Sequence, residues 1–163
     1  MKFAIKWFPP IALAALALSW ISGQIAAALG FDPPPQDLVR ILTNPTTPWP
    51  VKAKVGVVAV VVCPVIEEFV FRLGLHKWLL RRLFRLRFAA AAAISAAVFA
   101  AAHCMTGGIG TLLVTLAPLA FLGVAFAWVY ERTDRLYASI AEHALFNLLN
   151  FALCLLFPQL VLS

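Results

Sequence analysis

Long apolar stretches alternate with short polar or proline-rich ones along this chain. Five apolar stretches can be drawn, covering residues 7–29, 51–80, 88–103, 111–130 and 136–157. A helix that crosses a bilayer needs about 20 mostly apolar residues, within a range of roughly 17–25. The pattern therefore predicts an all-α fold, a polytopic membrane helix bundle with about five transmembrane helices.

The stretches between the apolar segments predict the loops. Residues 30–50 hold a run of three prolines at 33–35 and a second proline-rich part at 44–50, so this stretch cannot be a regular helix. Residues 81–87 form a basic patch, 106–110 a glycine-rich turn and 131–135 a short polar loop. We therefore divide the chain into residues 1–50, an N-terminal transmembrane helix with a proline-rich outer loop, and residues 51–163, a four-helix core.

Composition excludes a soluble globule with a polar shell. Hydrophobic residues make up 63% of the chain and charged residues 12%, and the mean hydropathy is +0.94. A net charge of +6 would suggest nucleic acid as the partner of a soluble protein. Here the basic residues gather at segment ends, where they orient a membrane protein. We therefore expect membrane lipids as partners and no nucleic acid.

Positive charge also predicts the orientation. With the amino terminus inside, nine of the 13 Lys and Arg residues lie in inside loops, three lie in outside loops, and Arg72 remains in the membrane. This bias favours a cytoplasmic amino terminus, and the small, alanine-rich chain points to a bacterial inner membrane. The first segment has a second interpretation as a cleaved signal peptide, because Lys2 and Lys6 precede an apolar stretch that ends in alanines.

Two adjacent acids interrupt the second apolar segment. Glu67 and Glu68 are followed by Arg72, which shares a helix face with Glu68 and can form an ion pair with it. Glu67 has no such local partner, and an ionisable residue within a membrane segment is by default a candidate functional residue. We predict Glu67 as a general base and Glu68 with Arg72 as its support. The alternative is an ion pair that only ties helices together.

Two further pairs at helical spacing occur in later segments. Phe99 and His103 share a face at the end of the third, so the phenyl ring can pack beside the imidazole and orient it. His143 and Asn147 share a face of the fifth, and two such donors can stabilise an oxyanion or form interhelical hydrogen bonds. At about 1.5 Å per residue, Glu67 and His103 lie roughly 20 and 22 Å from the same membrane face, and His143 roughly 10–18 Å.

We do not expect the other polar residues to take a direct part in catalysis. We expect Glu142, which faces away from His143, to be a neighbour or supporting group, and His76 to lie at the membrane interface. Cys104 follows His103 directly, and adjacent residues do not face each other on a helix. A thiol nucleophile is therefore not favoured.

The three motifs together resemble a known family. EEFVFR at 67–72, FAAAH at 99–103 and HALFN at 143–147 look like the motifs of the CAAX protease and bacteriocin-processing (CPBP) family, the type II CAAX prenyl endopeptidases and their bacterial self-immunity relatives. The chain departs from many relatives at Leu73, where they carry glycine, and it has fewer predicted spans than longer members. The resemblance covers residues 67–147.

The resemblance implies an intramembrane endopeptidase with its active site inside the bundle. Glu67, helped by His103, would activate a water, His143 and Asn147 would form the oxyanion hole, and Glu68, Arg72 and Phe99 would support them. No cofactor is favoured. Zinc is the alternative, with Glu67, Glu68, His103 and His143 as ligands, although the chain has no His-Glu-x-x-His motif.

The expected substrate is a membrane-associated protein or peptide, such as a C-terminal sorting tail or a bacteriocin precursor. Two other classes stay open: a non-catalytic immunity or scaffold protein of the same fold, and a small proton-coupled transporter. A transporter would more often show an inverted repeat, and none is visible in the sequence. Cleavage activity and its dependence on Glu67 distinguish the three.

Overall fold

A computed structural model describes residues 2–31, 36–104 and 108–159. Its helical elements, in chain order, are α1 (Lys2–Ala28), α2 (Asp37–Thr43), α3 (Trp49–Val57), η1 (Val58–Val62), α4 (Cys63–Glu68), η2 (Phe69–Leu83), α5 (Phe88–Cys104), α6 (Ile109–Thr133) and α7 (Leu136–Leu156). The described residues contain no strand. The predicted all-α membrane bundle is confirmed.

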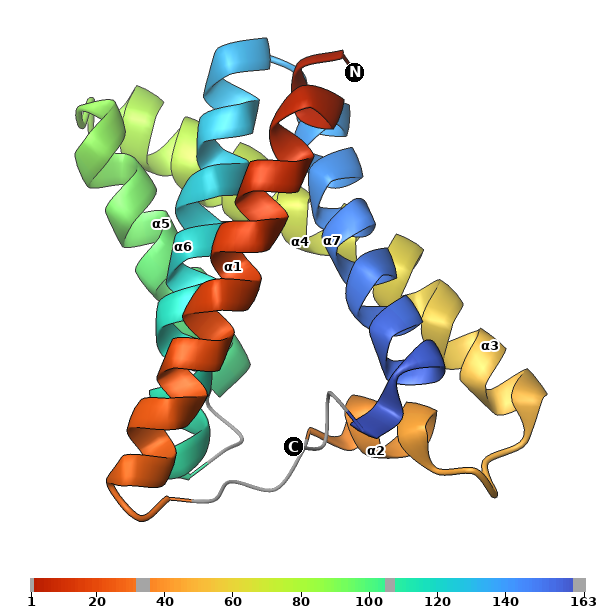
Figure 1. Ribbon diagram of the computed structural model, residues 1–163. Coiled ribbons are helices and arrows are strands. Elements are labelled where there is room, and N and C mark those ends of the chain that lie inside the picture. The colour runs from red at the N-terminus through yellow and green to blue at the C-terminus, as the bar shows by residue number, and fades with distance from the viewer. Residues whose placement is uncertain (1, 32–35, 105–107, 160–163) are drawn as a thin grey trace.

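Three of the five predicted segments are long and apolar enough to cross a bilayer: α1, α6 and α7. The third predicted segment corresponds to α5, which has 17 residues, and the second to the helical run from Trp49 to Leu83. Figure 1 shows α1, α5 and α6 side by side, while α7 and α3 diverge from them toward the lower right. The amino terminus, the end of α6 and the start of α7 lie together at one end of the bundle (Figure 1).

The second predicted segment is one helical run but not a uniform α-helix. It begins at Trp49, and η1 and η2 within it have π-helical turns, in which each N–H reaches the carbonyl five residues back. Such turns are rare and are found mostly at functional sites. The run passes diagonally behind α7 and α6 to the start of α5 (Figure 1), so its middle carries the acidic pair into the interior.

Small side chains allow the helices to approach closely. A Cβ on Gly123 of α6 would come within 2.8 Å of Ala96 on the alanine-rich α5, so only glycine fits this contact. Ala4, Ile11 and Ala15 of α1 join a buried cluster with residues of α6 and Ala138 of α7. Interfaces rich in small residues are typical of membrane helix packing.

The loops differ from the prediction in two places. A seven-residue helix, α2, lies within the stretch 30–50 that the prolines predicted to be loop, because residues 37–43 contain no proline. α6 continues through Glu131 to Thr133, and Asp134 ends it with a left-handed φ of 50°. Glu131 is therefore a helix residue rather than a loop residue. The prolines at 33–35 and residues 106 and 107 of the glycine-rich turn lie outside the described residues, and Pro118 is buried inside α6.

Candidate active site

Six of the seven predicted site residues come together where α4, η2, α5 and α7 meet. They are Glu67 and Glu68 of α4, Arg72 of η2, Phe99 and His103 of α5, and His143 of α7. The seventh, Asn147, lies one turn further along α7 and contacts another part of the chain. Glu67 and His103, whose estimated depths below the membrane face are similar, lie close together in the structure, and so does His143, whose estimated depth agrees only loosely.

Glu68 is fully buried and held from three sides. Arg72 Nε lies 3.2 Å from Glu68 Oε2, an ion pair whose N–H is not aligned for a hydrogen bond. The Ser139 hydroxyl donates to the same oxygen, and His143 Nδ1 lies 3.1 Å from Oε1. A buried carboxylate needs such partners to remain charged. The geometry agrees with the supporting role predicted for Glu68 and Arg72.

Arg72 is enclosed by aromatic rings. Its guanidinium carbon lies 5.0 Å from the centre of the Phe99 ring and 5.6 Å from that of Phe126, and the side chain is fully buried. Ring faces attract a cation by about 2 kcal/mol or more when the pair is desolvated. The same two rings pack against the imidazoles: Phe99 lies 4.5 Å from His103 and Phe126 stacks 4.7 Å from His143. Phe99 therefore contacts both the Arg72 guanidinium and the His103 imidazole.

Glu67 faces both histidines. Its Oε2 lies 3.6 Å from His103 Nε2 and 3.7 Å from His143 Nε2. That oxygen is buried and accepts no hydrogen bond from any described residue, although 22% of the side chain as a whole is exposed. Glu67 thus differs from its neighbour Glu68 in having a free, inward-facing oxygen.

The hydrogen bonds made by Nδ1 of His103 and His143 determine whether the Nε2 atoms that face Glu67 carry a proton or a lone pair. His103 Nδ1 lies 2.9 Å from the Phe99 carbonyl, which can only accept, so Nδ1 carries the proton. His143 Nδ1 donates to the Glu68 carboxylate in the same way. In the neutral rings both Nε2 atoms therefore offer lone pairs, and three acceptor atoms face one small space.

Three converging acceptors can hold a species that supplies protons or positive charge. A water molecule there can donate one O–H to Glu67 and the other to an imidazole, which leaves its oxygen lone pairs free to attack. A metal ion would also suit two Nε2 atoms whose Nδ1–H groups are fixed by a carboxylate and a backbone carbonyl. Among the described residues, however, no group of three or more His, Cys, Asp or Glu side chains is arranged as a metal site.

Asn147 is already engaged within the fold. Its amide nitrogen donates to the carbonyl of Ala59 in η1, at 2.8 Å. The second N–H of this amide remains for other partners. The role of Asn147 in an oxyanion hole stays a prediction.

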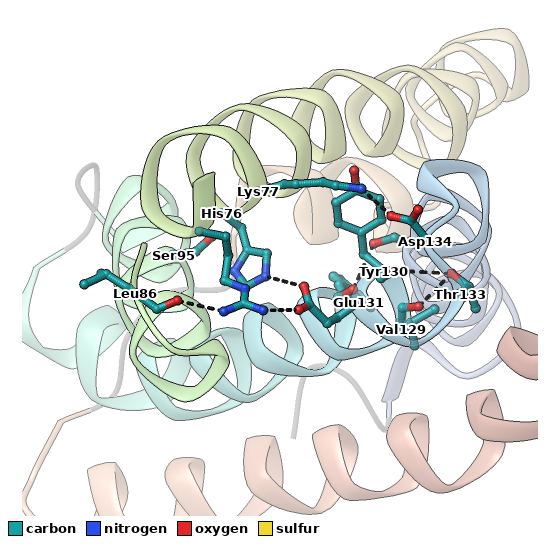
Figure 2. A network of polar contacts seen from close by, with 12 residues as sticks. His76, Lys77, Leu86, Ser95, Val129, Tyr130, Glu131, Thr133 and Asp134 are labelled. Atoms are coloured by element: carbon teal, nitrogen blue, oxygen red, sulfur yellow. Dashed lines mark hydrogen bonds and ion pairs between the residues drawn. The ribbon is translucent and has the colours of Figure 1, made fainter. Parts of the chain in front are cut away.

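A second polar cluster lies on the same helix, beyond the site. His76 Nε2 lies 3.4 Å from Glu131 Oε2, and Arg81 donates to Glu131 Oε1 and to the Leu86 carbonyl, each at 2.7 Å. Figure 2 shows these side chains joining η2 to the end of α6, with Lys77 reaching Asp134. The side chain of His76, which we expected at the membrane interface, is fully buried against Phe88 and Glu131, and its depth in the membrane stays a prediction.

Sequence reasoning missed two members of the site and undervalued one residue beside it. Ser139 stands one turn before His143 and Phe126 lies on α6, and neither residue type signals chemistry by itself. The spacing of four between Ser139 and His143 was the available signal. Glu142, expected to be a supporting group, is fully buried, and both its oxygens lack a partner among the described residues.

Comparison with known proteins gives one result. The family model described as type II CAAX prenyl endopeptidase Rce1-like matches residues 49–149, which is more than half of the chain. No curated protein and no solved structure matches the chain. The matched range runs from the first residue of α3 into α7, so it contains all seven predicted site residues.

Proposed function

The chain belongs to the type II CAAX prenyl endopeptidase Rce1-like family, and on that premise we propose that it is an intramembrane endopeptidase whose general base is Glu67. Membership and the apolar helices make it a CAAX-type protease in a lipid environment. The observation that supports the glutamate mechanism best is the contact of Glu67 Oε2 with two imidazole Nε2 atoms, at 3.6 and 3.7 Å.

The reaction would begin with a water held between Glu67 and the histidines. Glu67, helped by His103, takes a proton from the water as its oxygen bonds to the carbonyl carbon of the scissile peptide. Negative charge then develops on the carbonyl oxygen. Collapse of this intermediate breaks the C–N bond, and the proton on Glu67 passes to the leaving amine. The products are a carboxylic acid and an amine.

The developing oxyanion needs donors. His143 would supply one from Nε2 after protonation, and Glu68, which already accepts from its Nδ1, would stabilise the resulting imidazolium. The free N–H of Asn147 would be the second donor. Both assignments follow the third motif of the family.

Zinc remains the alternative for activation of the water. Glu67, His103 and His143 would hold it, and the metal would lower the pKa of a bound water. Glu68 would then act as the partner of His143 rather than as a ligand, because its oxygens already contact Arg72, Ser139 and His143. The same residues serve both mechanisms, so the two mechanisms have to be distinguished by whether activity survives the removal of metal.

The substrate we propose is a membrane-associated protein or peptide, such as a C-terminal sorting tail or a bacteriocin precursor. The enzyme would lie in a bacterial inner membrane with its amino terminus in the cytoplasm, as the distribution of basic residues favours. The Oε2 atom of Glu67 supports a catalyst over a scaffold of the same fold, because it faces two imidazole Nε2 atoms and has no hydrogen-bond partner among the described residues.

The test is cleavage by the purified protein in lipid nanodiscs, with products identified by mass spectrometry. The substrates are candidate membrane peptides encoded beside the gene. We expect cleavage by the wild type, survival of activity after thorough chelation, and loss of activity in Glu67→Gln. Activity lost to chelation and restored by zinc would replace the glutamate mechanism with the metal one. Activity retained by Glu67→Gln would refute both.

A further inference from the structure

One face of α7 follows the helical run 49–83 through four successive turns. The residues of this face are Ser139, His143, Asn147 and Phe151. Ser139 and His143 contact Glu68 in the site, as described above. Further along, Asn147 contacts Ala59, and a Cβ on Gly56 would meet the Phe151 ring at 2.6 Å. The site and the close approach of α3 to α7 thus belong to one continuous seam.

Ala59 lies at a gap in the backbone hydrogen bonding of this run. In η1 each N–H bonds to the carbonyl five residues back, and the N–H of Cys63 reaches the carbonyl of Val58 in this way. The next bond in the series would join residue 64 to the carbonyl of Ala59. Residue 64 is proline, which has no N–H. The helix therefore cannot satisfy this carbonyl, and the Asn147 amide donates to it instead.

We propose that Asn147 is a positioning residue that takes the place of the N–H missing at Pro64 and thereby fixes the His143 ring against Glu67 and Glu68. His143 lies one turn before Asn147 on α7, and Pro64 lies three residues before Glu67 on α4. The hydrogen bond ties together the two helices that carry these groups. Its effect on cleavage rests on the proposed function, but its effect on the His143 ring does not.

Asn150 of the same helix makes a different kind of hydrogen bond. Its amide donates to the Phe146 carbonyl in its own helix, at 2.9 Å, and makes no hydrogen bond to another element among the described residues. Asn147 instead joins two helices and donates to a carbonyl that the π-helical register would pair with the N–H missing at Pro64. One turn further along α7, the Phe151 ring packs closely against Gly56, where no side chain would fit.

A double-mutant cycle between Asn147→Ala and Pro64→Ala tests the proposal. Asn147→Ala leaves the Ala59 carbonyl unpaired, whereas Pro64→Ala gives the helix back an N–H for it. The chain has three histidines, so ¹⁵N NMR of ring-labelled protein in micelles resolves each, with assignment by His→Gln variants. We expect Asn147→Ala to shift the His143 ring signals and to lower Tm by about 2–5 °C. The double variant should regain most of the lost Tm, because the Ala59 carbonyl is paired again, whereas the His143 ring signals should stay shifted, because no bond then joins Asn147 of α7 to η1.

Asn150→Ala is the matched control and should leave the His143 signals unchanged. Once a substrate is known, Asn147→Ala should lower the rate of cleavage by about 10²-fold, and the double variant should stay impaired, because it too lacks the Asn147 N–H proposed as an oxyanion donor. A double variant that is no more stable than Asn147→Ala, or whose His143 ring signals return to those of the wild type, overturns the proposal. Unchanged ring signals in Asn147→Ala do the same. Because the NMR readout needs no substrate, failure of the protease assignment would be seen separately.

Discussion

Two polar clusters lie along the same helical run and use similar residues in opposite ways. The inner cluster, centred on Glu67, Glu68, Arg72, His103 and His143, lies where four helical elements meet. The outer cluster, centred on His76, Lys77, Arg81, Glu131 and Asp134, joins the end of η2 to the end of α6. Both contain acids, cations and histidine.

The two clusters differ in what they leave unpaired. In the outer cluster both Glu131 oxygens have partners, and Arg81 and Glu131 are each one-third exposed. In the inner cluster the Arg72–Glu68 pair is fully buried, while an oxygen of Glu67 faces two imidazoles without a hydrogen bond. Nδ1 of His76 in the outer cluster is also buried without a partner among the described residues, so the contrast concerns the carboxylates. A fully paired carboxylate such as Glu131 fastens helices together, whereas a buried one with a free acceptor oxygen can act on a substrate.

The largest effect on stability should come from the buried pair. Arg72→Met removes the charge that compensates Glu68 and should destabilise the protein by about 3–5 kcal/mol, because an uncompensated buried carboxylate remains. Thermal unfolding in detergent and the yield of monodisperse protein measure this. Adding Glu68→Gln to Arg72→Met should recover much of the loss. Arg82→Met, at an exposed position of the same helix, is the control, and an equal effect there would contradict the comparison.

A matched pair of histidine variants distinguishes a catalytic role of the inner cluster from a stabilising role of the outer one. His103→Gln should lower the rate of cleavage by about 10²-fold, because a general acid–base group is lost, with little change in Tm. His76→Gln should leave cleavage near the wild-type rate and lower Tm instead, since His76 is fully buried in the outer cluster. The measurements are cleavage rates and thermal unfolding of both variants. Equal losses of activity would mean that the two clusters do not divide these tasks.

The sequence revealed those site residues whose polar character conflicts with their surroundings. Glu67 and Glu68 stand in an apolar run, and His103 and His143 end or interrupt others, so hydropathy and a spacing of four were enough to propose them. Ser139 and Phe126 could not be found in this way, because serine and phenylalanine are ordinary residues in membrane helices. Their roles depend on which helix faces which, and that is a tertiary property.

The helix boundaries show the same limit. α5 and α7 agree with the predicted segments to within a residue at each end, because apolar runs and membrane helices have the same extent. Glu131 was assigned to a loop because it is charged, yet it lies in the last turns of α6, where Arg81 and His76 are its partners. The hydropathy pattern of this stretch gave no signal of the π turns of η1 and η2.

A smaller effect is expected from the outer ion pair. Arg81→Met should destabilise the protein by about 1 kcal/mol or less, since partly exposed ion pairs are worth little and solvent screens them. In thermal unfolding we expect a Tm lower by about 2–4 °C, and high salt should narrow the gap between wild type and variant. A loss as large as that of Arg72→Met would show that the outer cluster is as critical to folding as the inner one.

The smallest effect concerns the rim of the outer cluster. The Lys77 ammonium, which contacts Asp134, holds the pKa of that carboxyl below its usual value. A lowered folded-state pKa contributes stability above the unfolded-state pKa, and this contribution is lost as the pH falls through the folded-state value. Between pH 5 and pH 3, thermal unfolding of the wild type should therefore show a slightly steeper loss of Tm than Asp134→Asn, which has no carboxyl to protonate.

Asp134 is fully exposed, so the difference should be a small one that high salt removes. Parallel Tm profiles for the two proteins at low salt would mean that the contact with Lys77 does not persist in solution, and the outer cluster would then reduce to His76, Arg81 and Glu131.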